Sequence, residues 1–327
     1  MNSKISKRTA RELVKTLYTD KIGQIEIVNN GTRNKVYVVH TLTKESDVVV
    51  RISEDQKTFG NYVKEQWCMN RAKQEGIPVP EVLEVSNHIV NFPYFVAKYN
   101  RGKVANRETN FSKLYFEMGK LLKIIHNIKT DGYGEIFNWS QNQLSRVNSW
   151  QDYLNNTFHI DESIQYFIDN DIYPKTVIDR IQYVFNDLKS FKFSPILCHN
   201  DYLEKNILIN SNGSISSVLD WELAISSHPF RDLGKTWRDM IFLKRDKYVE
   251  KFFEGYGLSR NKYITYRDYM FIFDVLYDVK ELKVAKKSGD IKKFNGIKEF
   301  WNMFFNNSLE LLSSIENYES RETSFSL

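Results

Sequence analysis

Short alternating stretches of apolar and polar residues dominate the first hundred positions of the chain. Two of these stretches flank the turn signal NNG at residues 29–31, an arrangement typical of a β-hairpin. One longer stretch, residues 61–76, has apolar positions at helical spacing and ends at a glycine. The strand-like stretches are QIEIV (24–28), KVYVV (35–39), DVVVRIS (47–53), IPVPEVLEV (77–85) and YFVAKY (94–99). This pattern predicts a small sheet and one long helix.

Beyond the first hundred residues the pattern becomes helical. The segment 111–128 places its apolar side chains on one helical face, and further helices are expected over roughly 139–156 and 174–190. The segment 197–222 interrupts them, with two short strands joined by NSNGS and a polar loop at each end. Three long amphipathic patterns follow from Phe230 to the end of the chain.

The change of pattern predicts an α+β protein with two lobes. We expect a strand-rich N-terminal lobe over residues 1–98 and a larger helical lobe over 99–327, joined by a connector near 98–102. A cleft between two lobes is a natural site for a ligand.

The composition indicates a folded protein of a reducing compartment. The chain has 327 residues, rich in Phe and Tyr, and its two cysteines, Cys68 and Cys198, lie in apolar surroundings without metal-ligand spacing. No apolar run approaches the roughly 18–20 residues of a membrane helix, and the polar N-terminus lacks the apolar core of a signal peptide. We therefore expect a cytoplasmic protein without membrane association.

The charge favours an anionic ligand over nucleic acid. The net charge of +5 would help to attract a nucleotide, but the excess is spread too thinly to predict a nucleic-acid surface. A nucleic-acid binder would instead show steep, salt-dependent retention on DNA. Nothing in the sequence implies a protein partner.

The segment LCHNDYLEKNILI (197–209) carries the most distinctive polar residues. Asp201 follows the apolar PILC at an expected strand end, where a carboxylate can orient or deprotonate an alcohol. A hairpin would return Asp220 to the side of Asn206, and the two side chains would suit Mg²⁺. Each residue taken alone is more typical of a turn, in which Asp and Asn bond their own backbone. The ordered set between two apolar strands favours a catalytic loop.

HNDYLEKN followed by VLDWE resembles the catalytic and metal loops of the aminoglycoside phosphotransferase and choline kinase-like family. The resemblance implies a protein-kinase-like fold and Mg²⁺-dependent phosphoryl transfer from ATP or GTP. It implies that Asp201 and Asn206 are catalytic, with Asp201 as the base, and that Asn206 and Asp220 hold the metal. It also implies that His199 organises the loop and that Asp232, in SSHPFRDLGK, braces it.

The resemblance extends to the nucleotide-binding half of the chain. NNGTRNKVYVV is similar to the phosphate-covering hairpin of the family, although an ordinary hairpin turn is an equally good reading of it. VVVRIS occupies the place of the strand whose Lys binds phosphate, but here the cation is Arg, which keeps the charge and binds in a forked way. The implied nucleotide-binding residues are Gly31, Thr32, Asn34, Arg51, Glu65, Lys98 and Tyr99.

The acceptor is expected to be a small molecule and not a protein. Asn200 stands where protein kinases have the Arg of His-Arg-Asp, and DWE stands in place of Asp-Phe-Gly. Asp274, Asp278 and Glu281 fall on one helical face, which would suit a polycation such as an aminoglycoside; a solvated helix face is the alternative.

The expected function is transfer of the γ-phosphoryl group of ATP or GTP to a hydroxyl of a small molecule, an aminoglycoside or macrolide antibiotic. The alternatives are a kinase of a small metabolite such as choline or an amino sugar, and a catalytically silent homologue that only binds nucleotide.

Overall fold

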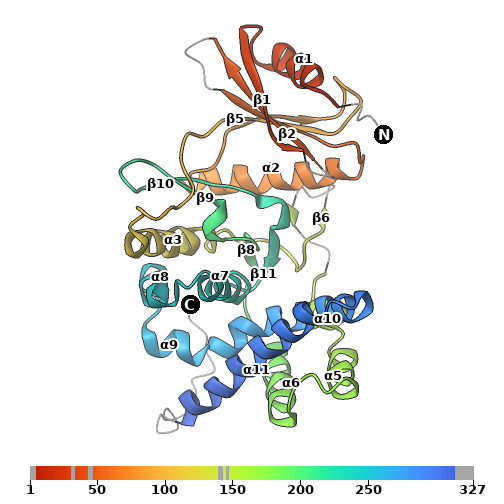
Figure 1. Ribbon diagram of the computed structural model, residues 1–327, viewed down its shortest axis with the longest axis vertical. Coiled ribbons are helices and arrows are strands. Elements are labelled where there is room, and N and C mark those ends of the chain that lie inside the picture. Colours follow the sequence, from red (N-terminus) through yellow and green to blue (C-terminus); the bar gives the residue numbers. More distant parts are fainter. Residues whose placement is uncertain (1–4, 31–33, 43–46, 139–142, 145–146, 314–327) are drawn as a thin grey trace. The chain divides into compact units, whose positions relative to one another are not determined.

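The computed structural model describes residues 5–30, 34–42, 47–138, 143–144 and 147–313 (Figure 1). Contacts within the chain divide it into two compact units. Unit 1 consists of Met1–Ser149 and Phe193–Ile264, and unit 2 consists of Trp150–Lys192 and Thr265–Leu327. Unit 1 holds the strand-rich part of the chain together with the segment HNDYLEKN. The division into lobes near residues 98–102 stays a prediction.

A five-stranded antiparallel sheet forms the first part of unit 1. Its strands, in the order in which they pair, are β1 (Ile22–Asn30), β2 (Lys35–Thr41), β3 (Val48–Ile52), β5 (Tyr94–Lys98) and β4 (Val82–Ser86). Each strand-like stretch of the sequence therefore contains a strand. Because side chains alternate across a strand, β3 buries Val48, Val50 and Ile52 in one core and directs Arg51 to the opposite face.

Helices cover both faces of this sheet. The helix α1 (Lys7–Leu17) packs Ala10, Leu13 and Val14 against the face of the sheet that buries Val48, Val50 and Ile52, and α2 (Thr58–Gln74) contacts β4 and β5 on the other side (Figure 1). The helix expected over 61–76 is thus confirmed as α2. The expected elements do not include α1, although its apolar positions recur with helical spacing.

Small strand pairs and helices form the rest of unit 1. The hairpin of β9 (Ile207–Ile209) and β10 (Ile215–Val218) confirms the two strands expected around NSNGS. A second pair joins β8 (Ile196–Cys198) to β11 (Ile225–Ser227), so that the loop over residues 199–206 begins at one strand pair and ends at the other. The helices and short 3₁₀ turns are α3 (Phe111–Ile125), η1 (Glu204–Asn206), η2 (Trp221–Leu223), α7 (Phe230–Phe242), η3 (Asp246–Tyr248), α8 (Val249–Tyr256) and α9 (Arg260–Thr265).

Of the helix expected over 139–156, residues 139–142 and 145–146 lie outside the described residues. The prediction is wrong for Gln143–Leu144, which form β7 and pair with β6 (Phe137–Asn138), and α4 begins only at Trp150. Asn148 and Ser149 stand directly before α4, and such side chains favour the start of a helix over its interior.

Two glycines allow α3 and α8 to cross closely. A Cβ atom on Gly119 would lie 2.1 Å from the carbonyl oxygen of Phe252, and a Cβ atom on Gly255 would lie 2.0 Å from that of Phe116. Neither position has room for a methyl group, which explains glycine inside both helices despite its low helix propensity. At the end of this crossing the Tyr256 hydroxyl lies 2.8 Å from a ring nitrogen of His126.

Gly119→Ala is expected to lower the free energy of unfolding by about 1–3 kcal/mol, because the helix backbones must separate to admit the methyl group. The matched control is Gly296→Ala in α11 (Ile291–Ser313), where the added Cβ would meet nothing within 4 Å. That change should raise stability by up to about 1 kcal/mol through helix propensity alone. Urea unfolding of both variants measures the difference, and shifts of the same sign would contradict the steric explanation.

The regular secondary structure in the described residues of unit 2 is all helical. Its helices are α4 (Trp150–Phe158), α5 (Ile160–Asp169), α6 (Lys175–Lys189), α10 (Arg267–Ser288) and α11. The helix expected over 174–190 is confirmed as α6. α10 is buried along most of its length and packs against α11 and α6. Among the described residues of both units, no helix combines the length and the apolar character needed to cross a membrane.

Candidate active site

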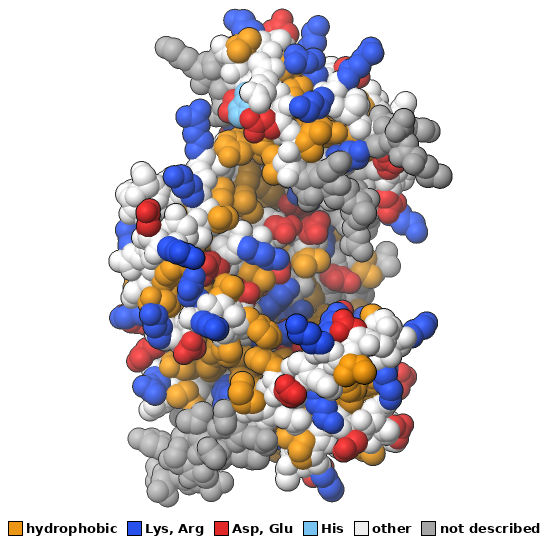
Figure 2. Space-filling model, in the orientation of Figure 1, with side chains coloured by type: hydrophobic (Ala, Val, Ile, Leu, Met, Phe, Trp, Pro, Cys, Tyr) orange, Lys and Arg blue, Asp and Glu red, His pale blue; other side chains and the backbone are white. Residues whose placement is uncertain are grey.

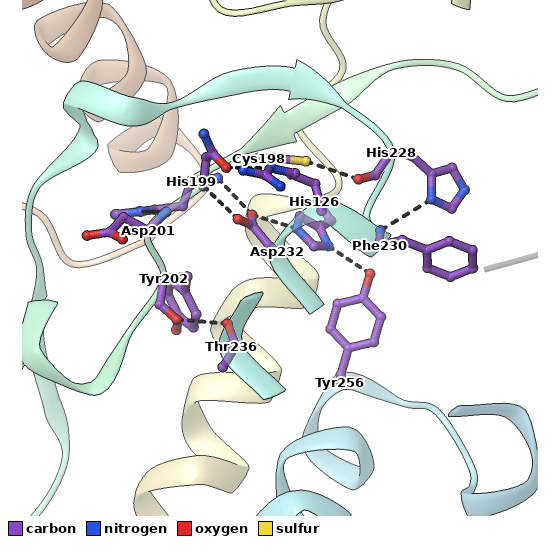
Figure 3. A network of polar contacts seen from close by, with 12 residues as sticks. His126, Cys198, His199, Asp201, Tyr202, His228, Phe230, Asp232, Thr236 and Tyr256 are labelled. Carbon is purple, nitrogen blue, oxygen red and sulfur yellow. Dashed lines mark hydrogen bonds and ion pairs between the residues drawn. The ribbon is translucent and has the colours of Figure 1, made fainter. Parts of the chain in front are cut away.

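Asp232 lies at the centre of a buried polar network between α7 and the loop that follows β8 (Figure 3). Its carboxylate accepts hydrogen bonds from the backbone N–H of His199 at 2.7 Å and of Asn200 at 2.6 Å. The His126 ring is 3.1 Å away on the other side. Burial opposes the charge, but hydrogen bonds and nearby ring nitrogens outweigh it and hold the pKa of Asp232 below its usual value. These contacts tie Asp232 to the loop after β8, and its role in supporting a catalytic loop stays a prediction.

The contacts of Asp232 hold an unusual backbone conformation at Asn200. Asn200 has a φ of +61°, in the left-handed region, which Asn tolerates better than most residues. Its side chain is also held, because its amide oxygen accepts from Arg231 at 2.7 Å and its amide nitrogen donates to the Leu223 carbonyl at 2.9 Å. This sharp bend directs the next residue, Asp201, away from the strand.

The following turn of α7 continues along the same loop. The Lys235 ammonium donates to the Asn200 carbonyl at 2.6 Å and lies 2.9 Å from Asp201 Oδ1. The Thr236 hydroxyl donates to the Tyr202 carbonyl at 2.8 Å. Residues at helical spacing on α7 thus bind successive residues of the loop, so the helix acts as a template for the loop's conformation.

Asp201 is buried but remains charged. Its Oδ2 atom accepts from the Asn206 amide at 2.9 Å and lies 3.1 Å from the Lys205 ammonium. Burial alone would raise the pKa of this carboxyl, but Lys235 and Lys205 outweigh burial and hold the pKa below its usual value. An ionised carboxylate at a loop tip is suited to accept the hydrogen bond of an alcohol.

His199 connects this loop to the one that carries Asp220. Its Nε2 atom donates to the Leu219 carbonyl at 2.9 Å, and its Nδ1 atom accepts from the Asp201 N–H at 3.3 Å. Burial lowers the pKa of His199, in keeping with this neutral tautomer. The Leu219 N–H also donates to the Asn206 carbonyl at 2.9 Å. The two loops are therefore joined as the hairpin geometry predicts.

Asn206 and Asp220 offer the oxygens that a divalent cation would require. The Asn206 amide nitrogen donates to both the carbonyl and the carboxylate of Asp201, which directs its amide oxygen elsewhere. Asp220 has a φ of +65° where η2 begins. Burial and then the Glu222 carboxylate raise the pKa of Asp220, with Asp201 adding to the effect.

The charges around Asp220 fit Mg²⁺. Partial burial and then the neighbouring carboxylates of Glu222 and Asp201 raise the pKa of Asp220, and a hard cation with oxygen ligands would relieve the repulsion between these carboxylates. Figure 2 shows acidic side chains gathered in a hollow below the sheet of unit 1. The structure thus brings together the three residues expected to hold the metal and the acceptor hydroxyl.

Arg51 forms a second charged cluster in unit 1. Its guanidinium donates to both oxygens of Glu65, at 2.8 and 2.7 Å, and reaches Glu222 at 3.5 Å. The rings of Tyr62 and Phe95 lie 5.1 and 5.3 Å from the guanidinium carbon. Burial would lower the pKa of Arg51, but the carboxylates raise it, so the charge is retained. The expected pairing of Arg51 with Glu65 is thus present.

Three of the other expected nucleotide-binding residues, Asn34, Lys98 and Tyr99, form hydrogen bonds within unit 1. The Asn34 side chain accepts from the Tyr62 hydroxyl at 3.1 Å. The backbone N–H of Lys98 donates to the backbone carbonyl of Glu81 at 2.8 Å, and that of Tyr99 donates to the backbone carbonyl of Asp47 at 2.7 Å. Gly31 and Thr32 lie outside the described residues. The nucleotide-binding roles of this set stay predictions.

The three acidic residues expected on one helical face are not equally accessible. Asp274 and Asp278 are buried within unit 2, where Trp301 Nε1 donates to Asp278 Oδ2 at 2.9 Å. Glu281 is exposed and lies 2.5 Å from the Lys293 ammonium. The three carboxylates therefore do not form one exposed acidic stripe, and their role in acceptor binding stays a prediction.

Several contacts of the site are not among the expected ones. Lys235 touches Asp201, and Arg231 holds Asn200, yet both lie about thirty residues further along the chain. Lys64, one residue before Glu65, donates to the Ala224 carbonyl at 3.2 Å and so ties α2 to the loop after Asp220. A helical reading of RDLGKTW, with Asp232 at its start, would have placed Lys235 one turn later on the same face.

Comparison with known proteins identifies the family. The model of the phosphotransferase enzyme family matches residues 24–271, more than half of the chain. The chain belongs to this family. No curated protein matches it by sequence. The match confirms the resemblance seen in the two loops.

Solved structures of the phosphotransferase family share the fold. A thermostable mutant of aminoglycoside phosphotransferase APH(4)-Ia, bound to ADP and hygromycin B, is 14% identical with a TM-score of 0.64, over 89% of this chain and 95% of that one. A GDP and kanamycin complex of a second aminoglycoside phosphotransferase is 13% identical with a TM-score of 0.61, over 92% and 99%. The α+β, protein-kinase-like fold expected from the sequence is confirmed.

Proposed function

We propose that this phosphotransferase family member transfers the γ-phosphoryl group of ATP or GTP to a hydroxyl of a small molecule, an aminoglycoside or macrolide antibiotic. The observation that carries the proposal is the charged, buried Asp201, hydrogen-bonded to Asn206 and close enough to Asp220 for the two carboxylates to influence each other. The complexes of similar structures with ADP, GDP, hygromycin B and kanamycin support a nucleotide donor and an aminoglycoside acceptor.

In the proposed reaction, the acceptor oxygen forms a bond to the γ-phosphorus as the bond to the bridging oxygen breaks. The nucleoside diphosphate leaves with the electron pair, and the hydroxyl proton passes to Asp201. Most of the catalysis would come from positioning and charge, because little covalent chemistry falls to the protein. Asp232 and His199 contribute by holding the loop in one conformation.

The proposed metal is Mg²⁺, held by Asn206 and Asp220. When bound, it would neutralise part of the phosphate charge. Arg51, fixed by Glu65, would add a second positive charge for the phosphates. The pair keeps the guanidinium in place, which supports nucleotide binding. The feature that disfavours a silent homologue is the presence of Asp201, Asn206 and Asp220 together.

The direct test is a search for a phosphorylated product. The protein would be incubated with Mg-ATP or Mg-GTP and a panel of aminoglycosides, macrolides, choline and amino sugars, and mass spectrometry would detect a compound that gains one phosphoryl group. Asp201→Asn serves as the control. A product on choline or an amino sugar would replace the antibiotic by a metabolite, and nucleotide binding without any product would support a silent homologue.

Asp220→Ala is expected to weaken Mg²⁺-dependent nucleotide binding by about tenfold or more, because a carboxylate ligand of the metal is lost. Calorimetric titration of nucleotide at increasing Mg²⁺ concentrations measures the effect. Asp246→Ala, at an exposed aspartate of unit 1, is the matched control and should leave the titration unchanged. An Mg²⁺ titration of Asp220→Ala that overlies the wild-type curve would remove Asp220 from the metal site.

A further inference from the structure

Lys235 makes contacts that loop support alone does not require. The Asn200 carbonyl that it binds belongs to a residue already fixed at both N–H and side chain, by Asp232, Arg231 and Leu223. The ammonium also lies 2.9 Å from Asp201 Oδ1. Lys235 therefore contacts the carboxylate that would meet the acceptor hydroxyl in the proposed reaction, a contact that support of the loop does not explain.

The position of Lys235 suits a phosphoryl group. In the proposed reaction the acceptor hydroxyl contacts Asp201, so the oxygens of the transferred group must come close to whatever else contacts that carboxylate. An ammonium has three N–H donors, and two are directed to Asn200 and Asp201. The third can be donated to a phosphoryl oxygen.

The two lysines that contact Asp201 differ in how firmly they are held. Each lysine contacts one oxygen of Asp201. The Lys205 side chain is 64% exposed, whereas the Lys235 side chain is 25% exposed, lies on α7 and also donates to the Asn200 carbonyl. A preorganised cation costs little rearrangement as charge develops, whereas a mobile surface cation is largely screened by water. The geometry therefore favours Lys235.

We infer that Lys235 binds the γ-phosphoryl group during transfer, exchanging part of its contact with Asp201 for a contact with a phosphoryl oxygen. This inference rests on the proposed function and deepens it, since it assigns to α7 a cation for the transferred group. Arg51 lies in a separate cluster with Glu65 and would serve the other phosphates.

The test compares a nucleoside triphosphate with a diphosphate, in the absence of acceptor. Calorimetry would measure binding of the β,γ-imido triphosphate and of the diphosphate, with adenine and with guanine, in excess Mg²⁺. Lys235→Met should reduce the preference for the triphosphate by about tenfold or more, because one charge-assisted hydrogen bond to the γ-phosphate is lost. Diphosphate affinity should stay within about twofold, since loop geometry is held by Asp232.

Two further variants complete the design. Lys247→Met removes an exposed lysine of η3 and should leave the preference for triphosphate over diphosphate unchanged. Lys235→Arg should also retain this preference, because the positive charge is kept. The arginine variant also serves if the methionine variant fails to fold, since a preference lost in Lys235→Arg despite native diphosphate affinity would contradict the inference. With a known acceptor, Lys235→Met should lower kcat by about a hundredfold with the acceptor KM little changed.

The outcomes separate this inference from the proposed function. Equal losses for triphosphate and diphosphate in Lys235→Met would mean that the lysine only shapes the loop, and an unchanged preference would mean that it does not meet the γ-phosphate; either result overturns the inference. A wild-type protein that binds nucleotide with the expected preference but phosphorylates nothing overturns the proposed function alone. A wild-type protein that binds neither nucleotide overturns both.

Discussion

Asp201→Ala is expected to abolish phosphoryl transfer, lowering kcat by about 10²–10⁴-fold, the range that a general base contributes. The reason lies in the charge state of this carboxylate, which two ammonium groups keep ionised although it is buried. Nucleotide should bind as well as before or better, because removal of a negative charge near the phosphates leaves Lys235 and Lys205 free to attract them. Steady-state kinetics and calorimetry, performed on the same preparation, measure the two effects.

Asp201→Asn controls for shape in this experiment. The amide keeps the size of the carboxylate and an oxygen for Asn206, but it cannot accept a proton. Both variants should therefore be inactive. Both should also be folded, with thermal midpoints close to that of the wild type. Retained turnover in either variant would remove Asp201 from its role as base, and a loss of nucleotide binding parallel to the loss of kcat would assign it to the nucleotide site instead.

The loops that carry Asp201 and Asp220 are predictable from sequence because their geometry is local. Asp201, Asn206 and Asp220 lie within twenty residues, and the strand, loop and hairpin between them determine which side chains meet. The pairing of Arg51 with Glu65 is less local, since a strand and a helix must pack before the two meet, and the resemblance to a family supplies that information. Fold class likewise follows from the change between alternating and helical patterns.

Other features depend on packing that a periodic pattern does not specify. Helical spacing correctly places Asp274 and Asp278 on one face of α10, but the neighbouring helix covers that face, and Trp301 of α11 supplies the hydrogen-bond donor. Lys235 reaches Asp201 because α7 runs along a loop that lies thirty residues earlier in the sequence. Sequence periodicity indicates which residues share a face, whereas the identity of the facing element requires the tertiary structure.

Asp232→Ala is expected to lower the free energy of unfolding by about 3–5 kcal/mol, because buried groups that now bind a charged carboxylate would be left without it. The change removes the acceptor from the N–H groups of His199 and Asn200 and from the His126 ring, all of which are buried. The strained backbone of Asn200 then loses the hydrogen bond that holds it. Urea unfolding followed by circular dichroism measures the shift, with the exposed Asp246→Ala expected to change stability by less than about 0.5 kcal/mol.

The same substitution should also separate stability from catalysis. If Asp232 acts through the loop, the folded fraction of Asp232→Ala at low temperature should still bind nucleotide through Arg51 and Asp220, but transfer the phosphoryl group far more slowly, because Asp201 is no longer directed by a fixed bend. Activity per folded molecule distinguishes this from simple unfolding. A variant that loses less than about 1 kcal/mol and keeps wild-type activity would show that Arg231 and Leu223 hold the loop without Asp232, since their contacts to Asn200 would then suffice.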